Sequence, residues 1–145
     1  MAGVRVVSVA SGMSHTPALT DTGLVFSFGS TALGPGDLMP EDQFHPKTLR
    51  SEPVELEAPQ WQPRVIEALR GERVTAVAAG GHSLVLTATS DVLSFGVSST
   101  GELGHGADTV EVMLPTTIEA LRGQTTVALA AGIDVDFVHV RHSIA

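Results

Sequence analysis

The amino-acid sequence predicts an all-β fold made of repeated units, and two observations support this. First, the segment Pro63–Gly80 occurs again as Pro115–Gly132, and both copies contain the run I-E-A-L-R-G. Repeats of about 20–50 residues are typical of solenoids, propellers and arrays, and the offset of 52 residues between the two copies lies at the upper end of that range. Second, the chain has 15 glycines and many short valine-rich runs, which is the pattern of short strands joined by tight turns.

The first repeat contains two predicted strands separated by a turn. Val4–Val9 reads V-R-V-V-S-V, and a short β-branched run favours a strand. Leu24–Phe28 reads L-V-F-S-F and stops at Gly29. Just before it, Asp21–Gly23 reads D-T-G, a turn signal in which the glycine supplies positive φ.

The second repeat follows the same order. Val74–Ala78 and Leu84–Leu86 are predicted strands. The turn A-T-S-D then leads into the strand V-L-S-F, which Gly96 ends. Two residues separate Gly12 from His15 in the first repeat, whereas one separates Gly80 from His82 in the second. The backbone of the second repeat must therefore bulge or tighten at that point.

Three further segments complete the pattern. Gly96 is followed by a loop with three glycines, namely Gly101, Gly104 and Gly106. Pro63–Gly71 is ambiguous, because a proline at its start and a glycine at its end would also suit a short helix. In a β-repeat it would be an irregular or an outer-strand segment, and we expect the irregular one. The third repeat starts at Val127, reaches Gly132 and continues as a strand-like run to Ala145.

An acidic, proline-rich segment, Asp37–Gln62, separates the first two repeats. It contains four of the eight prolines (Pro40, Pro46, Pro53 and Pro59), and this density disfavours regular strand and helix. We predict a long surface loop, either a solvated insertion or an interaction loop. Its candidate partner-binding residues are Glu41, Asp42, Glu52, Glu55, Glu57 and Trp61. The tryptophan would either hold the loop against the domain or serve as an exposed anchor.

These motifs, taken in order, resemble the repeats of the regulator of chromosome condensation family. That repeat carries A-A-G-x-x-H-S-L-A-L-T, a turn, an apolar strand ending in an aromatic and a glycine, a G-x-L-G-x-G loop and a P-x-x-I-x-x-L segment. The best copy is Val77–Leu121, and the first copy lacks the glycine-rich loop. The expected structural residues of the repeats are Gly12, His15, Gly29, Gly80, His82, Gly96, Gly101, Gly104, Gly106 and Gly132.

The resemblance implies a β-propeller with blades of about four antiparallel strands, and radial repetition protects the edges of such short strands. We expect residues 1–36 to form the first repeat, 37–62 the insertion, 63–126 the second repeat and 127–145 a truncated third. The family's full propeller has seven blades, so this chain is expected to be a partial propeller. Its open flanks would be closed by self-association or by further blades.

Composition limits the classes of function. The net charge of −8 argues against a nucleic-acid partner, which requires clustered Lys and Arg. The chain has no cysteine, which excludes disulfides and thiolate metal sites. The N-terminus lacks the apolar core of a signal peptide, and no apolar run approaches the length of about 18 residues that a membrane helix needs. We therefore expect no nucleic acid, no membrane and an intracellular location, cytoplasmic or nuclear.

The residues that could support chemistry are better explained by structure. His15 and His82 are expected to bond backbone groups in buried turns. Asp134 and Asp136 could join a cation site, but the other calcium-loop ligands are missing. The glycine-rich loop lacks the G-K-[ST] ending of a phosphate cradle, and Ser83 lacks a nucleophile elbow. We expect no enzyme activity, no cofactor and no metal.

The resemblance favours a protein-interaction module as the function. The alternatives are guanine-nucleotide exchange on a small Ran-like GTPase, for which no exchange residue can be assigned here, and an inactive propeller fragment. For the repeat itself, we predict that Gly80→Val and Gly132→Val each destabilise the fold, because the turn excludes a Cβ.

Overall fold

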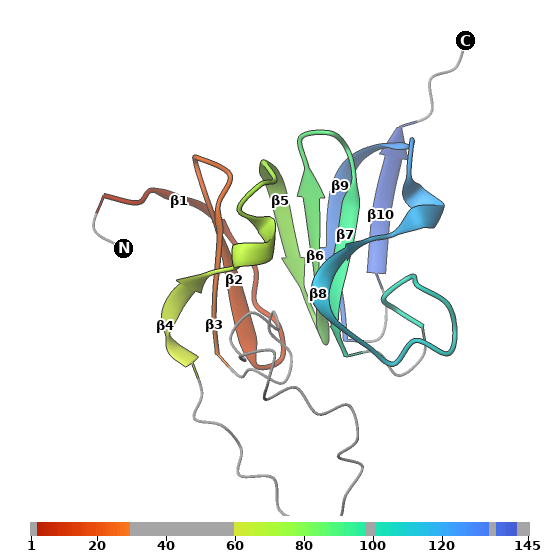
Figure 1. Cartoon of the computed structure of the whole chain (residues 1–145), viewed down its shortest axis with the longest axis horizontal. Coiled ribbons are helices and arrows are strands. Elements are labelled where there is room, and N and C mark those ends of the chain that lie inside the picture. Colours follow the sequence, from red (N-terminus) through yellow and green to blue (C-terminus); the bar gives the residue numbers. More distant parts are fainter. Residues whose placement is uncertain (1–2, 30–59, 98–100, 134–135, 142–145) are drawn as a thin grey trace, which may run out of the picture.

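The computed structural model describes residues 3–29, 60–97, 101–133 and 136–141, which form ten strands in three antiparallel sheets (Figure 1). The sheets follow one another side by side in chain order, and we call them blades 1, 2 and 3. Blade 1 consists of β1 (Val6–Val9), β2 (His15–Thr20), β3 (Val25–Gly29) and β4 (Gln60–Val65). Blade 2 consists of β5 (Val74–Ala79), β6 (His82–Thr87), β7 (Val92–Val97) and β8 (Glu111–Thr117). Blade 3 consists of β9 (Thr125–Ala131) and β10 (Asp136–Arg141).

The three blades share one pairing register, which confirms the repeat at the level of the backbone. Val9 pairs with Ala18, Val77 with Val85, and Leu129 with Val138. Each first strand also carries an irregularity near its start, at Val7, Thr75 and Val127. A bulge at the same place in every blade bends the strand in the same way. The partial-propeller architecture follows from this repetition.

The expectation of an irregular segment at Pro63–Gly71 was wrong. Its first residues belong to β4, which also takes in the end of the predicted insertion, and β4 pairs with β3 as the outer strand of blade 1. The β3–β4 pairing is irregular between Ser27 and Gly29, and an irregular outer strand tolerates a proline because the lost donor needs no partner. The repeated stretch in the sequence therefore closes one blade before it opens the next.

A short 3-10 helix follows the outer strand of each complete blade. These helices are η4 (Glu67–Leu69) and η5 (Glu119–Leu121), and they fall on the identical run I-E-A-L-R-G. Ile66, which precedes η4, and Leu69, its last residue, are both buried. In the described part of the chain, no helix is long and apolar enough to span a membrane.

The apolar core lies between the blades. One cluster joins blade 1 to blade 2 and is built of Leu19, Val25, Ile66, Leu69, Val74, Val85, Leu93 and Phe95. A second cluster joins blade 2 to blade 3: Ala78, Leu84, Leu86, Val92 and Ile118 are its buried members, and Leu129 and Val138 pack against them. Side chains alternate along β6, so Val85 faces blade 1 while Leu84 and Leu86 face blade 3. Each blade is therefore stabilised by its neighbours.

Candidate functional site at the blade junctions

A buried histidine of blade 1 bonds directly to blade 2. His15 Nε2 lies 2.7 Å from Ser83 Oγ, and both residues are buried. Burial, and to a smaller extent the nearby His82, lower the pKa of His15 to about 4, because a buried site disfavours the charged imidazolium. His15 is therefore neutral at physiological pH and acts as a hydrogen-bonding group within the junction.

The same arrangement recurs between blades 2 and 3. His82 Nε2 lies 2.6 Å from Asp136 Oδ2, and His82 is fully buried. Because an ionised carboxylate only accepts, the imidazole N–H is the donor. Asp136 pairs with Ala131 as Ser83 pairs with Ala79, so the serine and the aspartate occupy equivalent positions. Each histidine thus reaches the same position in the following blade.

These contacts correct the predicted role of both histidines. They were expected to bond backbone groups in their own turns, but their hydrogen bonds go to side chains of the next blade. The backbone of those turns is paired separately: Gly12 N–H donates to the His15 carbonyl, and Gly80 N–H to the His82 carbonyl, each at 2.9 Å. The second turn closes over one residue fewer, as the sequence required.

Backbone hydrogen bonds also cross both junctions. Met13 N–H donates to the Gly80 carbonyl at 2.9 Å, and Gly81 N–H donates to the Gly132 carbonyl at 3.0 Å. Gly80 lies so close to blade 3 that a Cβ added there would overlap the carbonyl of Gly132. This close approach of two backbones explains why a glycine follows β5.

The glycine-rich loop of blade 2 is held by a buried serine. Ser94 Oγ donates to the Leu103 carbonyl at 2.6 Å and lies 2.8 Å from His105 Nε2. The remaining structural glycines have positive φ angles and lie in this loop or at the ends of third strands; they are Gly29, Gly96, Gly101, Gly104 and Gly106. They shape turns, and the loop contains no anion-binding helix start among its described residues.

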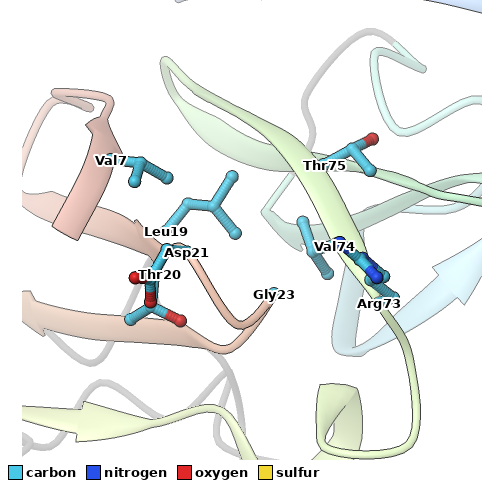
Figure 2. Close-up of a pocket in the computed structure, with 8 residues that line it drawn as sticks. All are labelled: Val7, Leu19, Thr20, Asp21, Gly23, Arg73, Val74 and Thr75. Atoms are coloured by element: carbon cyan, nitrogen blue, oxygen red, sulfur yellow. The ribbon is translucent and has the colours of Figure 1, made fainter. Parts of the chain in front are cut away.

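An open cleft lies beside the first junction (Figure 2). Its volume is about 340 Å³, and Val7, Leu19 and Val74 form its apolar lining. Asp21 on the β2–β3 turn and Arg73 before β5 place opposite charges on its two sides. The lining of this shallow cleft is as polar as it is apolar, so the cleft lacks the enclosed, mostly apolar form of a ligand site.

Most residues proposed for a partner-binding loop lie outside the described residues; these are Glu41, Asp42, Glu52, Glu55 and Glu57. Trp61 belongs to β4, although its side chain is not described. The structure describes the chain on either side of residues 30–59, where Gly29 of β3 pairs with Gln60 of β4. The chain therefore leaves blade 1 and returns to it at one β3–β4 pair.

Sequence reasoning did not identify the acceptor residues of the junctions. Asp136 was considered only as a weak cation ligand, and the described residues contain no cluster of three metal-ligating side chains. Ser83 was considered only as a nucleophile. The signal that could have identified them is their position in the repeat. Ser83 and Asp136 each follow the first strand of a blade, and they align with each other when the strand pairings of the two blades are superposed.

The comparisons with curated proteins agree on one kind of repeat. The chain is 37% identical over 133 residues to the human E3 ubiquitin-protein ligase HERC2, covering 89% of this chain and 2% of that protein. It is 34% identical over 133 residues to the RCC1 domain-containing protein RUG3, mitochondrial, of Arabidopsis thaliana, covering 89% of this chain and 25% of that protein. Protein RCC2 of Mus musculus is 34% identical over 137 residues, covering 92% of this chain and 23% of that protein. The chain thus spans a quarter or less of these relatives. No family model matches it.

Solved structures show the same fold. Yeast RCC1 (Prp20), in a structure with Kap60, superposes with a TM-score of 0.73 at 23% identity, covering 98% of this chain and 31% of that chain. Human WBSCR16 superposes with a TM-score of 0.67 at 24% identity, covering 92% of this chain and 30% of that chain. The three sheets are therefore consecutive blades of a partial β-propeller.

Proposed function

Because the chain belongs to the regulator of chromosome condensation repeat family, we propose that it is a protein-interaction module that binds without covalent chemistry. The main supporting observation concerns the residues on either side of the acidic segment. Residues 30–59, which include its acids, join Gly29 to Gln60, and these two residues pair in adjacent strands of blade 1. Blade 2 uses the much shorter stretch 98–110 at the same place.

The chemistry of the segment indicates the class of partner. Residues 37–62 carry Asp37, Glu41, Asp42, Glu52, Glu55 and Glu57 against Lys47 and Arg50. An acidic surface attracts a basic protein surface and raises its rate of association. We therefore propose a basic protein partner inside the cell, in the cytoplasm or the nucleus. The yeast relative Prp20p is described as binding Gsp1p and histones, and those partners belong to that protein.

A charge-reversal experiment tests this proposal. The triple variant Glu52→Lys, Glu55→Lys and Glu57→Lys is expected to abolish capture of a basic protein, with lysine-rich histone H1 as the probe. The matched control reverses three exposed acids on the blades, Glu72, Asp108 and Glu111, and changes the net charge by the same amount. If both variants lose capture equally, the net charge of the chain explains the binding, and the proposal that the acidic segment binds the partner is refuted.

Nucleotide exchange is the alternative function that a binding assay does not exclude. Release of a fluorescent guanine nucleotide from a Ran-type GTPase, measured with and without the chain, separates the two. We expect an unchanged release rate, because the chain spans under a third of the yeast propeller. An acceleration of about tenfold or more would replace the interaction-module proposal with exchange activity.

A further inference from the structure

The two blade junctions contain equivalent histidines with different partners. His15 of blade 1 bonds to Ser83 at 2.7 Å, and His82 of blade 2 bonds to Asp136 at 2.6 Å. Ser83 and Asp136 occupy equivalent positions in the strand pairing of their blades. One junction therefore joins its histidine to a neutral hydroxyl, whereas the other joins its histidine to a carboxylate.

The partner decides how each junction responds to a second proton on the imidazole ring. A neutral imidazole has one N–H donor and one acceptor, and an imidazolium has two donors. The carboxylate beside His82 accepts from either form, and protonation of the ring makes this hydrogen bond charge-assisted and stronger. The hydroxyl beside His15 has no charge to balance that of an imidazolium. The first junction therefore opposes protonation of its histidine more strongly than the second.

The surroundings of His15 supply no compensating charge. Strands β1, β3 and β5, which pack around β2, and the turn 10–14 carry no titratable residue. Strand β6 carries His82, which disfavours a positive charge at His15. Among the described residues, His15 Nδ1 is buried without a hydrogen-bond partner, and a Cβ added at Gly12 would lie 2.9 Å from it. A proton on this nitrogen would leave a buried donor without an acceptor, which costs stability.

We propose that the junction between blades 1 and 2 is an acid-sensitive joint, in which uptake of one proton at His15 Nδ1 opens this junction and leaves the junction between blades 2 and 3 closed. Opening separates β2 from β5 and uncovers the apolar cluster between the two blades, which includes Leu19, Val74 and Val85. The face that holds the blades together at neutral pH thereby becomes an exposed apolar surface in acid. This proposal is independent of the acidic segment and of the proposed function.

The pKa of His15 gives the pH range over which the joint responds. Burial, with a smaller contribution from His82, lowers this pKa from 6.5 to about 4 in the closed junction. Once the junction opens, the side chain reaches water and its pKa returns to about 6.5. The closed form is therefore fully favoured above pH 6.5 and loses this advantage as the pH falls from 6.5 towards 4. Between pH 7.5 and pH 5, the equilibrium constant for opening is expected to rise about 30-fold.

Amide hydrogen exchange can follow the two junctions separately, because backbone hydrogen bonds cross each of them. The Met13 and Val74 amides donate to carbonyls across the first junction, and the Gly81 amide donates to one across the second. Exchange on the full chain is followed by NMR and corrected for the intrinsic effect of pH. From pH 7.5 to pH 5, the protection factors of Met13 and Val74 should fall about 30-fold, whereas that of Gly81 should stay nearly constant. Unchanged protection of Met13 and Val74, or an equal fall at Gly81, would overturn the proposal.

Replacing the histidine tests whether it is the group that titrates. In His15→Gln the side chain cannot take up a proton, so protection of the Met13 and Val74 amides should no longer depend on pH. The readout is the ratio of the protection factors at the two pH values, so a general weakening of the junction does not affect it. A 30-fold fall that persists in this variant would assign the acid response to another group and overturn the proposal.

Exchanging the partner is the second, independent test, and it leaves both histidines in place. Asp136→Ser gives His82 the hydroxyl partner that His15 has, so the protection factor of the Gly81 amide is expected to become sensitive to acid. Asp108→Ser, at an exposed acid, is the matched control with the same change in net charge and should behave as the wild type. If the Gly81 ratio in Asp136→Ser equals that of the control, the partner does not decide the response, and the proposal fails.

Discussion

Substituting Gly80 by alanine tests the central feature of the fold, the close approach of neighbouring blades. A Cβ at this position would overlap the carbonyl of Gly132, and this obstacle is backbone that cannot rotate away. Gly132, which directly follows β9, must move outward to make room. Two polar contacts across the junction depend on its position: the bond from Gly81 N–H to that carbonyl and the bond from His82 to Asp136.

The expected cost follows from these contacts. Overpacking a tight site costs about 1–3 kcal/mol. A lost backbone hydrogen bond adds about 1 kcal/mol, and weakening a bond to a charged group adds about 1.5 kcal/mol. We therefore expect Gly80→Ala to destabilise the chain by roughly 3.5–5.5 kcal/mol. At about 3 °C per kcal/mol for a chain of this size, the melting temperature falls by about 10–15 °C.

Circular dichroism melts combined with amide hydrogen exchange measure this effect. Gly71→Ala is the matched control, because a Cβ there meets nothing within 4 Å. Amide exchange should increase first in β9 and β10, because these strands lose their packing against blade 2. If Gly80→Ala melts within about 2 °C of Gly71→Ala, the close approach does not stabilise the junction and the reasoning fails. A Cβ at Gly80 meets the blade that follows it, and no blade follows Gly132 within the described residues, so Gly132→Val is expected to cost less stability than Gly80→Val.

Three further predictions concern single side chains. The pKa of His15 is lowered to about 4, so the stability that this neutral side chain contributes is present above pH 6.5 and is lost as the pH falls from 6.5 to 4. The loss amounts to about 3 kcal/mol in the free energy of unfolding. Urea unfolding at several pH values should show a flatter profile in this range for His15→Gln, whereas the variant His139→Gln, at an exposed histidine, should keep the wild-type profile. Ser90 has φ 69° at the position where the first repeat has Gly23 with φ 87°, so Ser90→Gly should raise stability by about 0.5–1 kcal/mol, measured by urea unfolding; a loss of stability would contradict the strain. Ser94→Ala removes the bond to the Leu103 carbonyl and should cost about 1–2 kcal/mol, with faster amide exchange confined to residues 101–106.

The strands and turns could be predicted because their signals are local. A β-branched run, a D-T-G turn and a glycine after an aromatic are each recognised within a few residues. The second repeat contains a corresponding segment for each of them. Thr20 illustrates the point: its hydroxyl accepts from Leu24 N–H at 3.0 Å, and Thr87 does the same for Asp91 at 3.1 Å. Both threonines sit at the same distance before the turn in the sequence, so one structure explains both.

The junction contacts could not be predicted because they join residues far apart in the chain. His15 and Ser83 come from different blades, as do His82 and Asp136, and no local pattern pairs them. The prediction for the segment that forms the outer strand β4 was wrong for a related reason. Its partner β3 precedes a long insertion, so the sequence places β4 beside the blade that it does not belong to.

The side-chain bonds also give the chain a direction. Each complete blade is bonded to the next through a histidine, which meets Ser83 in blade 2 and Asp136 in blade 3. The series begins at His15 and ends at Asp136, since the third repeat has Val135 in place of a histidine. Both internal junctions are therefore closed by buried polar bonds between side chains. Such junctions resist opening, because separating the blades leaves buried polar groups without hydrogen-bond partners.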